Sequence, residues 1–474
     1  MPVPKQYQQM DSVEPMQVDE DGTLSQSNDF IIDNPNFDLD QYANSFQGLA
    51  KIRRLMFIAK HCPTLRADAL RLSLQTVEGT HNTPLFSELR QRVQQATGDP
   101  KYSPDAEDAV TFVTTTNRKA AILLERLDSD LKNYRSNSIK ESIRRGFDSL
   151  GDHYVDCGEL NQALKMYMRA RDHCTSSKHI VQLCLNVIKV SVLLGNWQQV
   201  LNYYSKADAS MEPIDLSKGP HSGVTGAQET ACRLLCAAGL AEMQNRKYKN
   251  SARLFCAAII EHCNFPDLLS PYCVAVYGGL CALASFDRQD LYTKVLTSST
   301  FKQYLELEPQ LRDVILNFYH SRYTSCLRTL DEMRSSFMLD MYLVPHMDML
   351  YTMIRNRALI QYFSPYLSVD LHKMASAFNT SVPYLEDELT QLILDGQISA
   401  RIDSHAKIMY ARNVDHRSAV FQKVLEVGEA YQLRTKALLI RSLLQKHNIC
   451  VTHSNDSKSG DNEVVSESTK RVKQ

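Results

Sequence analysis

Cysteine gives this sequence its best chance of chemistry, because a thiolate can act as a nucleophile, a redox centre or a metal ligand. The chain has 12 cysteines among 474 residues. None has the C-x-x-C spacing that is typical of zinc knuckles and redox sites. The residues of the adjacent pairs His61-Cys62 and His262-Cys263 point to different helix faces, so neither pair closes a metal site alone. We expect free, mostly buried thiols that pack as small hydrophobes, with no metal and no cofactor.

The common catalytic templates are also missing from the sequence. There is no Gly-rich phosphate loop, no H-E-x-x-H, no G-x-S-x-G and no H-x-H metal pair. Gly278-Gly279 lies in an apolar helical run, which favours close helix packing over ligand binding. The single tryptophan, Trp197, occupies a regular repeat position and is expected to fill a core. We therefore predict no catalytic residue and no enzymatic activity.

Positive and negative charges balance along the chain, with 53 Lys and Arg against 54 Asp and Glu. This balance gives no global attraction to nucleic acid or to an anionic membrane. The most apolar helical run, residues 272–286, is shorter than the roughly 18–20 residues that span a bilayer. The start, Met1–Lys5, lacks the apolar core of a signal peptide. We expect a protein of the reducing cytoplasm and nucleus, without a membrane segment.

The elements that must carry function in such a chain are helical. Apolar residues recur mostly three and four apart, and residues 147–170 follow the tetratricopeptide pattern with Phe147 in the Trp position. Small residues let two antiparallel helices approach, and aromatic residues fill the groove between them. The second helix recurs at the same five offsets, the last copy being looser: Leu160, Ala163, Leu164, Tyr167, Ala170; Trp197, Val200, Leu201, Tyr204, Ala207; Tyr248, Ser251, Ala252, Phe255, Ala258; Tyr323, Cys326, Leu327, Leu330, Met333. The pattern predicts a mostly α, right-handed, tetratricopeptide-like repeat array, broken most clearly by a loop over residues 211–226.

The pattern changes after residue 356 and predicts a winged helix. Its expected parts are a helix over 369–378, a turn at 379–381, a helix over 382–394 and two alternating strands with apolar residues at 398, 400 and 402 and at 408 and 410. A long helix over residues 415–447 follows, with one apolar stripe. Because the winged helix is already complete at that point, we expect the stripe to pack on something else.

Winged helices often read DNA through their second helix. Here that helix carries four acidic residues and neither Lys nor Arg, so it would repel phosphates. We favour assembly with partner subunits through the open sheet edge and the long helix, although the chain's own C-terminal helix is an alternative cover for that edge. The candidate partner-contact residues are Ile398, Arg401, Lys407, Ile408, Tyr410, Arg412, Val420, Val424, Val427, Tyr431 and Leu438.

Helical repeats that run into a winged helix without basic recognition residues resemble the PCI domain. That module is shared by the proteasome lid, the COP-nine signalosome and the translation initiation factor three complex. Blocks between about residues 34 and 447 are similar to the signalosome's first-subunit family: Phe37–Tyr42, Arg54–Ile58, His61–Leu65, Ser138–Arg145, Cys184–Val190, Tyr277–Leu283, Asn356–Pro365 and Leu385–Leu392.

The resemblance implies a non-catalytic scaffold subunit of the complex that removes the ubiquitin-like modifier Nedd from cullins. Its implied partners are other PCI-domain subunits, a metalloprotease-type subunit that carries the chemistry, and a cullin-RING ligase as substrate of the assembly. Two alternatives stay open. One is a PCI subunit of the proteasome lid or of an initiation factor complex, which the N-terminal blocks disfavour. The other is a winged-helix nucleic-acid binder.

These patterns divide the chain into five predicted segments. Both ends are polar and cannot bury enough apolar surface to offset their chain entropy. The segments are a disordered tail 1–33, N-terminal helical repeats 34–246, a PCI domain 247–413 (helical part 247–355, winged helix 356–413), a bundle helix 414–448 and a disordered tail 449–474.

Overall fold

A computed structural model of the chain describes residues 30–32, 38–104, 106–211, 222–263, 265–412, 416–447 and 449. The predicted disordered tails, 1–33 and 449–474, lie outside these residues except for 30–32 and 449. The described residues form twenty α-helices and three β-strands, which confirms the mostly α prediction.

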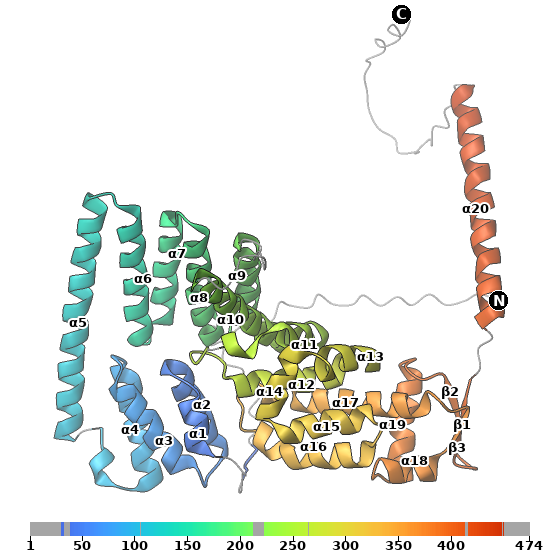
Figure 1. Cartoon of the computed structure of the whole chain (residues 1–474), viewed down its shortest axis with the longest axis horizontal. Coiled ribbons are helices and arrows are strands. Elements are labelled where there is room, and N and C mark those ends of the chain that lie inside the picture. The colour runs from blue at the N-terminus through green and yellow to red at the C-terminus, as the bar shows by residue number, and fades with distance from the viewer. Residues whose placement is uncertain are drawn as a thin grey trace, which may run out of the picture. The chain divides into compact units, whose positions relative to one another are not determined.

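The helices follow one another along the chain with few long connections (Figure 1). The N-terminal helices are α1 (Leu39–Asn44), α2 (Gly48–His61), α3 (Arg66–Glu78), α4 (Thr83–Thr97) and α5 (Glu107–Ser136). The next are α6 (Lys140–Asp156), α7 (Leu160–Ala170), α8 (Ser177–Leu194), α9 (Trp197–Ser210), α10 (Ser222–Gln244) and α11 (Tyr248–Ala257). Then come α12 (Pro271–Ser285), α13 (Arg288–Leu291), α14 (Ser299–Leu307), α15 (Pro309–Tyr319), α16 (Tyr323–Phe337) and α17 (Met347–Phe363).

The C-terminal part contains the strands and the longest helix. Its elements are β1 (Ser368–Asp370), α18 (Leu371–Ala377), α19 (Val382–Leu394), β2 (Ala400–Asp403), β3 (Ile408–Ala411) and α20 (His416–Lys446). Short 3₁₀ or π turns also occur, at η1 (Pro100–Tyr102), η2 (Arg171–His173), η3 (Ile260–His262), η4 (Tyr292–Leu296) and η5 (Val344–His346). The chain divides into two units, residues 1–398 with 402–409 and residues 399–401 with 410–474.

Within the first unit, consecutive helices from α5 to α12 pack as neighbours, each on the next (Figure 1). The predicted loop over 211–226 is shorter than expected, because α10 already begins at Ser222. Residues 212–221 lie outside the described part of the chain.

The four repeat copies share one turn between their helices. Each second helix begins at the first repeated residue: α7 at Leu160, α9 at Trp197, α11 at Tyr248 and α16 at Tyr323. Two positions earlier the backbone has a positive φ, between 61° and 88°, at Gly158, Gly195, Arg246 and Ser321. The N–H of the following residue donates to a carbonyl of the preceding helix at 2.8–2.9 Å in all four. Glycine favours such a conformation, so the sequence signals the turn only in the first two copies.

Glycines set how closely the paired helices approach. A Cβ at Gly151 would lie 2.4 Å from the ring of Tyr167, and one at Gly239 would lie 2.9 Å from the ring of Phe255. The predicted glycine–aromatic packing is therefore confirmed at two copies of the repeat. Gly278, in an apolar helix, also allows a close contact, since a Cβ added there would lie 2.8 Å from the Phe301 ring.

The copy around α9 departs from the predicted register. Tyr203, only 6% exposed, is the buried tyrosine, whereas Tyr204 is half-buried. Ile188 stands where the copies around α7 and α11 place glycine, and it is fully buried. Trp197 is also half-buried rather than a core residue, and its ring meets Tyr342 edge-on with centroids 6.0 Å apart.

Helix α8 is long and apolar enough to cross a membrane by length and composition alone. However, 56% of it is buried, and it packs against α7, α9 and α10. A helix that is covered on several sides needs apolar residues on all of them. The shorter apolar helix α12 contacts α11, α14, α15 and α17 for the same reason.

A buried ion pair fastens the N-terminal helices to later parts of the first unit. Arg54 on α2, 2% exposed, pairs with Asp340 with an Nη1–Oδ2 distance of 3.0 Å. Its guanidinium also donates to the Leu268 carbonyl at 3.2 Å and stacks over Phe46 at 4.2 Å. The Tyr277 hydroxyl donates to the same Asp340 carboxylate at 2.6 Å. Residues almost 300 positions apart in the sequence thus meet in one polar cluster inside an apolar core.

Candidate protein-interaction surfaces

The winged helix has the predicted parts with one addition. The expected helix over 369–378 begins later, because residues 368–370 form strand β1 and α18 starts at Leu371. The Asp370 side chain accepts a hydrogen bond from the His372 N–H at 2.9 Å and so caps α18. The second helix coincides with the prediction, since α19 covers Val382–Leu394.

The strand order shows which strands form the edges of the sheet. The three strands lie in the order β1-β3-β2, so β3 is central and the free edges belong to β1 and β2. Ile408 and Tyr410, chosen from the sequence as edge residues, are therefore on the strand that is paired on both sides. The sequence pattern missed β1, which has only three residues.

The hairpin places the predicted contact residues in different environments. Ile398 is only 5% exposed and packs inside the winged helix, which leaves little of it for a partner. On β3 the buried residue is Met409, while Ile408 is half-buried and Tyr410 is 46% exposed. Arg401 and Arg412 are exposed. The outer face of the hairpin thus offers one aromatic and two cationic side chains.

Helix α19 holds three of the four acidic residues, since Asp395 is its C-cap, and two of the three are used inside the protein. Glu386 binds the Lys407 ammonium with an Nζ–Oε1 distance of 2.8 Å. Glu388 pairs with Arg355 of α17 at 2.7 Å. The wing therefore loses Lys407 as a free cation, while Asp387 stays exposed on α19. This arrangement suits phosphate binding even less than the sequence suggests.

Helix α20 presents all of its predicted stripe to solvent. Val420, Val424, Val427, Tyr431 and Leu438 are 61–70% exposed. Exposed large apolar side chains are common singly, but a long row of them on one element marks an interaction site.

The apolar surface of α20 is wider than the predicted stripe. A second row of exposed apolar side chains runs one position further along the helix, at Phe421, Leu425, Leu439 and Leu443. Counting from Val420, 100° per residue places the first row within about 40° of Val420 and the second row at about 100–140°. The sequence-based prediction of one stripe does not include the second row. Two adjacent rows suit a helix that contacts more than one neighbour in a bundle.

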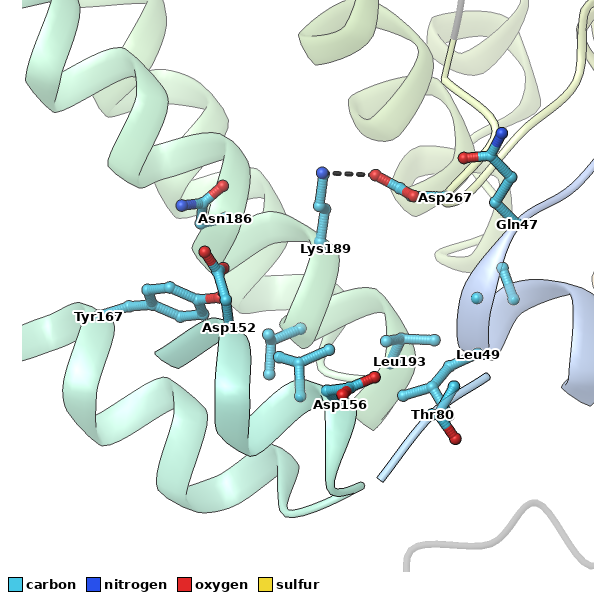
Figure 2. Close-up of a pocket in the computed structure, with 14 residues that line it drawn as sticks. Gln47, Leu49, Thr80, Asp152, Asp156, Tyr167, Asn186, Lys189, Leu193 and Asp267 are labelled. Carbon is cyan, nitrogen blue, oxygen red and sulfur yellow. Dashed lines mark hydrogen bonds and ion pairs between the residues drawn. The ribbon is translucent and has the colours of Figure 1, made fainter. Parts of the chain in front are cut away.

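A small pocket lies where α2 begins, next to α6 and α8 (Figure 2). Its volume is about 250 Å³. Its acidic and basic side chains each have a partner in the protein: Asp152 accepts from Tyr167 at 2.6 Å, Lys189 pairs with Asp267 at 2.5 Å, and Asp156 pairs with His81. Because these charged side chains already bind partners within the protein, we interpret the pocket as a contact region between helices and not as a ligand site.

Comparison with known proteins decides between the candidate families. Residues 110–294 match the family described as 26S proteasome subunit RPN7, and residues 324–413 match the PCI domain. The COP9 signalosome complex subunit 1b of Drosophila melanogaster is 46% identical over 95% of this chain and 94% of its own length. The chain belongs to the COP9 signalosome complex subunit 1 family.

Other relatives agree with this membership. Subunit 1 of the COP9 signalosome complex of Arabidopsis thaliana is 43% identical over 88% of this chain and 92% of its own length. The 26S proteasome non-ATPase regulatory subunit 6 of Caenorhabditis elegans is 23% identical over 72% of this chain and 81% of its own length. The chain is thus more similar to these subunit 1 relatives than to this proteasome subunit.

The family matches cover the winged helix and most of the repeats. The PCI match starts in α16 and ends after β3, so α20 lies beyond it. The RPN7 match runs from α5 to η4 and crosses the predicted boundary between residues 246 and 247. The segment boundaries drawn from the sequence stay predictions.

Proposed function

We propose that this protein is a non-catalytic scaffold subunit of the COP9 signalosome. The assembly removes the ubiquitin-like Nedd modifier from cullins and so regulates cullin-RING ubiquitin ligases. The single observation that carries the scaffold role is the exposed apolar surface of α20, together with membership in the subunit 1 family.

Helix α20 is proposed to enter a helical bundle formed with other subunits. Fully burying a side chain of the size of Val, Leu or Phe contributes about 1.5–3 kcal/mol relative to leaving it exposed. The two apolar rows hold nine such side chains, so association through them outweighs the entropy of joining the bundle.

The winged helix is proposed to add to a row of PCI sheets. Open strand edges at β1 and β2 carry backbone donors and acceptors that a partner strand can pair. The expected partners are PCI-domain subunits and a metalloprotease-type subunit, with the cullin-RING ligase as substrate of the assembly. We place the isopeptidase chemistry in the metalloprotease-type subunit, because this sequence has no H-x-H pair. We also propose that the protein works in both cytoplasm and nucleus, which fractionation of cells with a tagged chain tests.

Substitution at the β2 edge tests sheet pairing. Arg412 N–H donates to the Ser399 carbonyl at 2.9 Å. Antiparallel alternation then directs the Ile402 N–H away from β3, towards the free edge. Ile402→Pro removes this donor while keeping the hairpin, and Ile402→Val is the matched control that keeps it. We expect the proline variant alone to co-purify less with partner subunits. Equal recovery of both variants would remove the sheet-edge contact from the proposal.

Activity measurements test the non-catalytic role. The purified chain alone is expected to leave a Nedd-modified cullin intact, whereas the complex reconstituted with it is expected to cleave the modifier. Cleavage by the chain alone would overturn the assignment. The nucleic-acid alternative predicts duplex binding by the purified chain that weakens with salt. We expect none at low salt, because α19 is acidic and Lys407 is already paired.

A further inference from the structure

Three cysteines that share no metal-binding motif in the sequence, Cys232, Cys236 and Cys263, meet inside the first unit. Cys232 and Cys236 are four residues apart on α10, which places both thiols on one face of the helix. Cys263 follows η3 and reaches the same point. The three Sγ atoms lie within 4.8 Å of one another, and those of Cys236 and Cys263 are 3.4 Å apart. All three side chains are at most 3% exposed.

This cluster differs from the other buried cysteines of the described chain. Nine of the eleven described cysteines are buried, and single ones such as Cys281, whose sulfur accepts from the Ser251 hydroxyl, have no second thiol among the candidate metal ligands. Thiolate ligands stand about 2.3 Å from zinc, so tetrahedral geometry requires sulfur atoms about 3.8 Å apart. One separation in the cluster is 3.4 Å and none exceeds 4.8 Å, so shifts of about 1 Å or less bring the three sulfur atoms to that spacing.

A fourth polar group borders the three thiols. Tyr304 on α14 is fully buried, and its hydroxyl has no hydrogen-bond partner of good geometry although it faces Cys263. An unpartnered buried hydroxyl is costly unless it serves a purpose. Its place beside Cys263 makes it the candidate for a fourth ligand, directly or through a water. Arg233, beside Cys232 and paired with Glu229, also acts electrostatically on Cys263.

We propose that Cys232, Cys236 and Cys263 bind one Zn²⁺ ion, with Tyr304 completing the site. Thiolates select soft or borderline ions and disfavour Mg²⁺ and Ca²⁺, which take oxygen ligands. The ion would fasten η3 and the chain after it to α10. Its role would be structural, because closed sites with mostly sulfur ligands contribute folding free energy.

Metal titration of the full chain tests this site. The protein is purified with a non-metal-binding reductant, stripped of metal with a chelator, and titrated with Zn²⁺ against a chromophoric chelator. Co²⁺ serves as a spectroscopic probe through its thiolate charge-transfer absorption. We expect one equivalent of Zn²⁺, a charge-transfer band with Co²⁺ and a higher melting temperature of the zinc-loaded chain.

Matched variants separate the cluster from ordinary buried thiols. Cys236→Ala should weaken Zn²⁺ binding by more than about 100-fold, whereas Cys281→Ala, equally buried on α12, should leave it unchanged. Should Cys236→Ala not fold, Tyr304→Phe keeps the ring packing and should weaken binding by about 10-fold. Substoichiometric binding, absence of the cobalt band, or unchanged affinity in both Cys236→Ala and Tyr304→Phe would overturn the proposal.

Discussion

The Arg54 cluster and helix α20 differ in which side chains they bury: the cluster buries charged groups, whereas α20 exposes apolar ones. In the cluster, charged and aromatic groups from distant parts of the sequence are buried, and each finds its partner within the chain. On α20, apolar side chains that normally seek a core are more than half exposed. The charged groups of the first region pair within the chain, whereas the apolar side chains of the second are exposed, and we propose that a partner subunit covers them. Changes in the first should therefore alter stability, and changes in the second should alter assembly.

The largest effect on stability is expected at Asp340. Asp340→Asn keeps the shape but leaves the Arg54 charge, 2% exposed, without its counterion. Breaking a buried ion pair in this way costs about 3–5 kcal/mol. Urea denaturation of the first unit measures the loss. The exposed pair Arg328–Glu332 is the control, since Arg328→Ala should cost no more than about 0.5 kcal/mol. Equal losses of unfolding free energy from the two substitutions would contradict the claim that the buried pair contributes more stability than an exposed one.

Glycine-to-alanine substitutions compare the tightly packed repeat with the exposed helix α20. Gly151→Ala puts a Cβ 2.4 Å from the Tyr167 ring and should cost about 1–3 kcal/mol through overpacking. Gly428→Ala on α20 meets nothing within 4 Å and should instead stabilise its helix, by up to about 1 kcal/mol. Thermal unfolding of the two variants measures both changes. If both alanines shift the melting temperature in the same direction, the close packing in the repeat has been overestimated.

A buried histidine predicts how stability depends on pH. Burial, aided by Arg246, lowers the pKa of His346 to about 4, and the Tyr248 hydroxyl lies 3.1 Å from its Nδ1. The unfolded chain binds a proton there near pH 6.5, while the folded chain does not. Stability should thus fall as pH drops from about 6.5 towards 4, by on the order of 1 kcal/mol per pH unit. His346→Gln should flatten this part of a denaturation-against-pH curve, and the exposed His405→Gln should leave it unchanged. An unaltered slope in His346→Gln would show that other groups set the pH dependence.

The repeats were predictable from sequence because their packing is local. Leu160, Trp197, Tyr248 and Tyr323 each begin a helix, as the recurring offsets require. The departure at Tyr204 coincides with Ile188 on α8 in place of the glycine of two other copies, and the five-residue pattern does not include that helix. The Arg54–Asp340 pair was also out of reach, since nothing in either segment indicates that they meet.

The interaction surface was only partly predictable. Alternation on β2 is correct, but the central place of β3 depends on the three-residue strand β1, which is too short for a periodic signal. The stripe from Val420 to Leu438 is exposed, and its packing on a partner stays a prediction. The second row lies outside the single period on which that prediction rests. A four-residue spacing does link Cys232 to Cys236, yet Cys263 joins them only through the fold.

The central claim is that α20 serves assembly and not the chain's own stability, and one matched pair of variants tests it most directly. Val424→Ser, Tyr431→Ser and Leu438→Ser are combined in one chain. Gln422→Ser, Glu429→Ser and Lys436→Ser, on the opposite face, are combined in the control. Both chains are measured for urea unfolding and for affinity to the remaining subunits of the complex. We predict equal unfolding free energies within about 0.5 kcal/mol, with at least about 100-fold weaker association for the stripe variant alone. A stripe variant that unfolds more easily yet joins the complex with unchanged affinity would contradict the account.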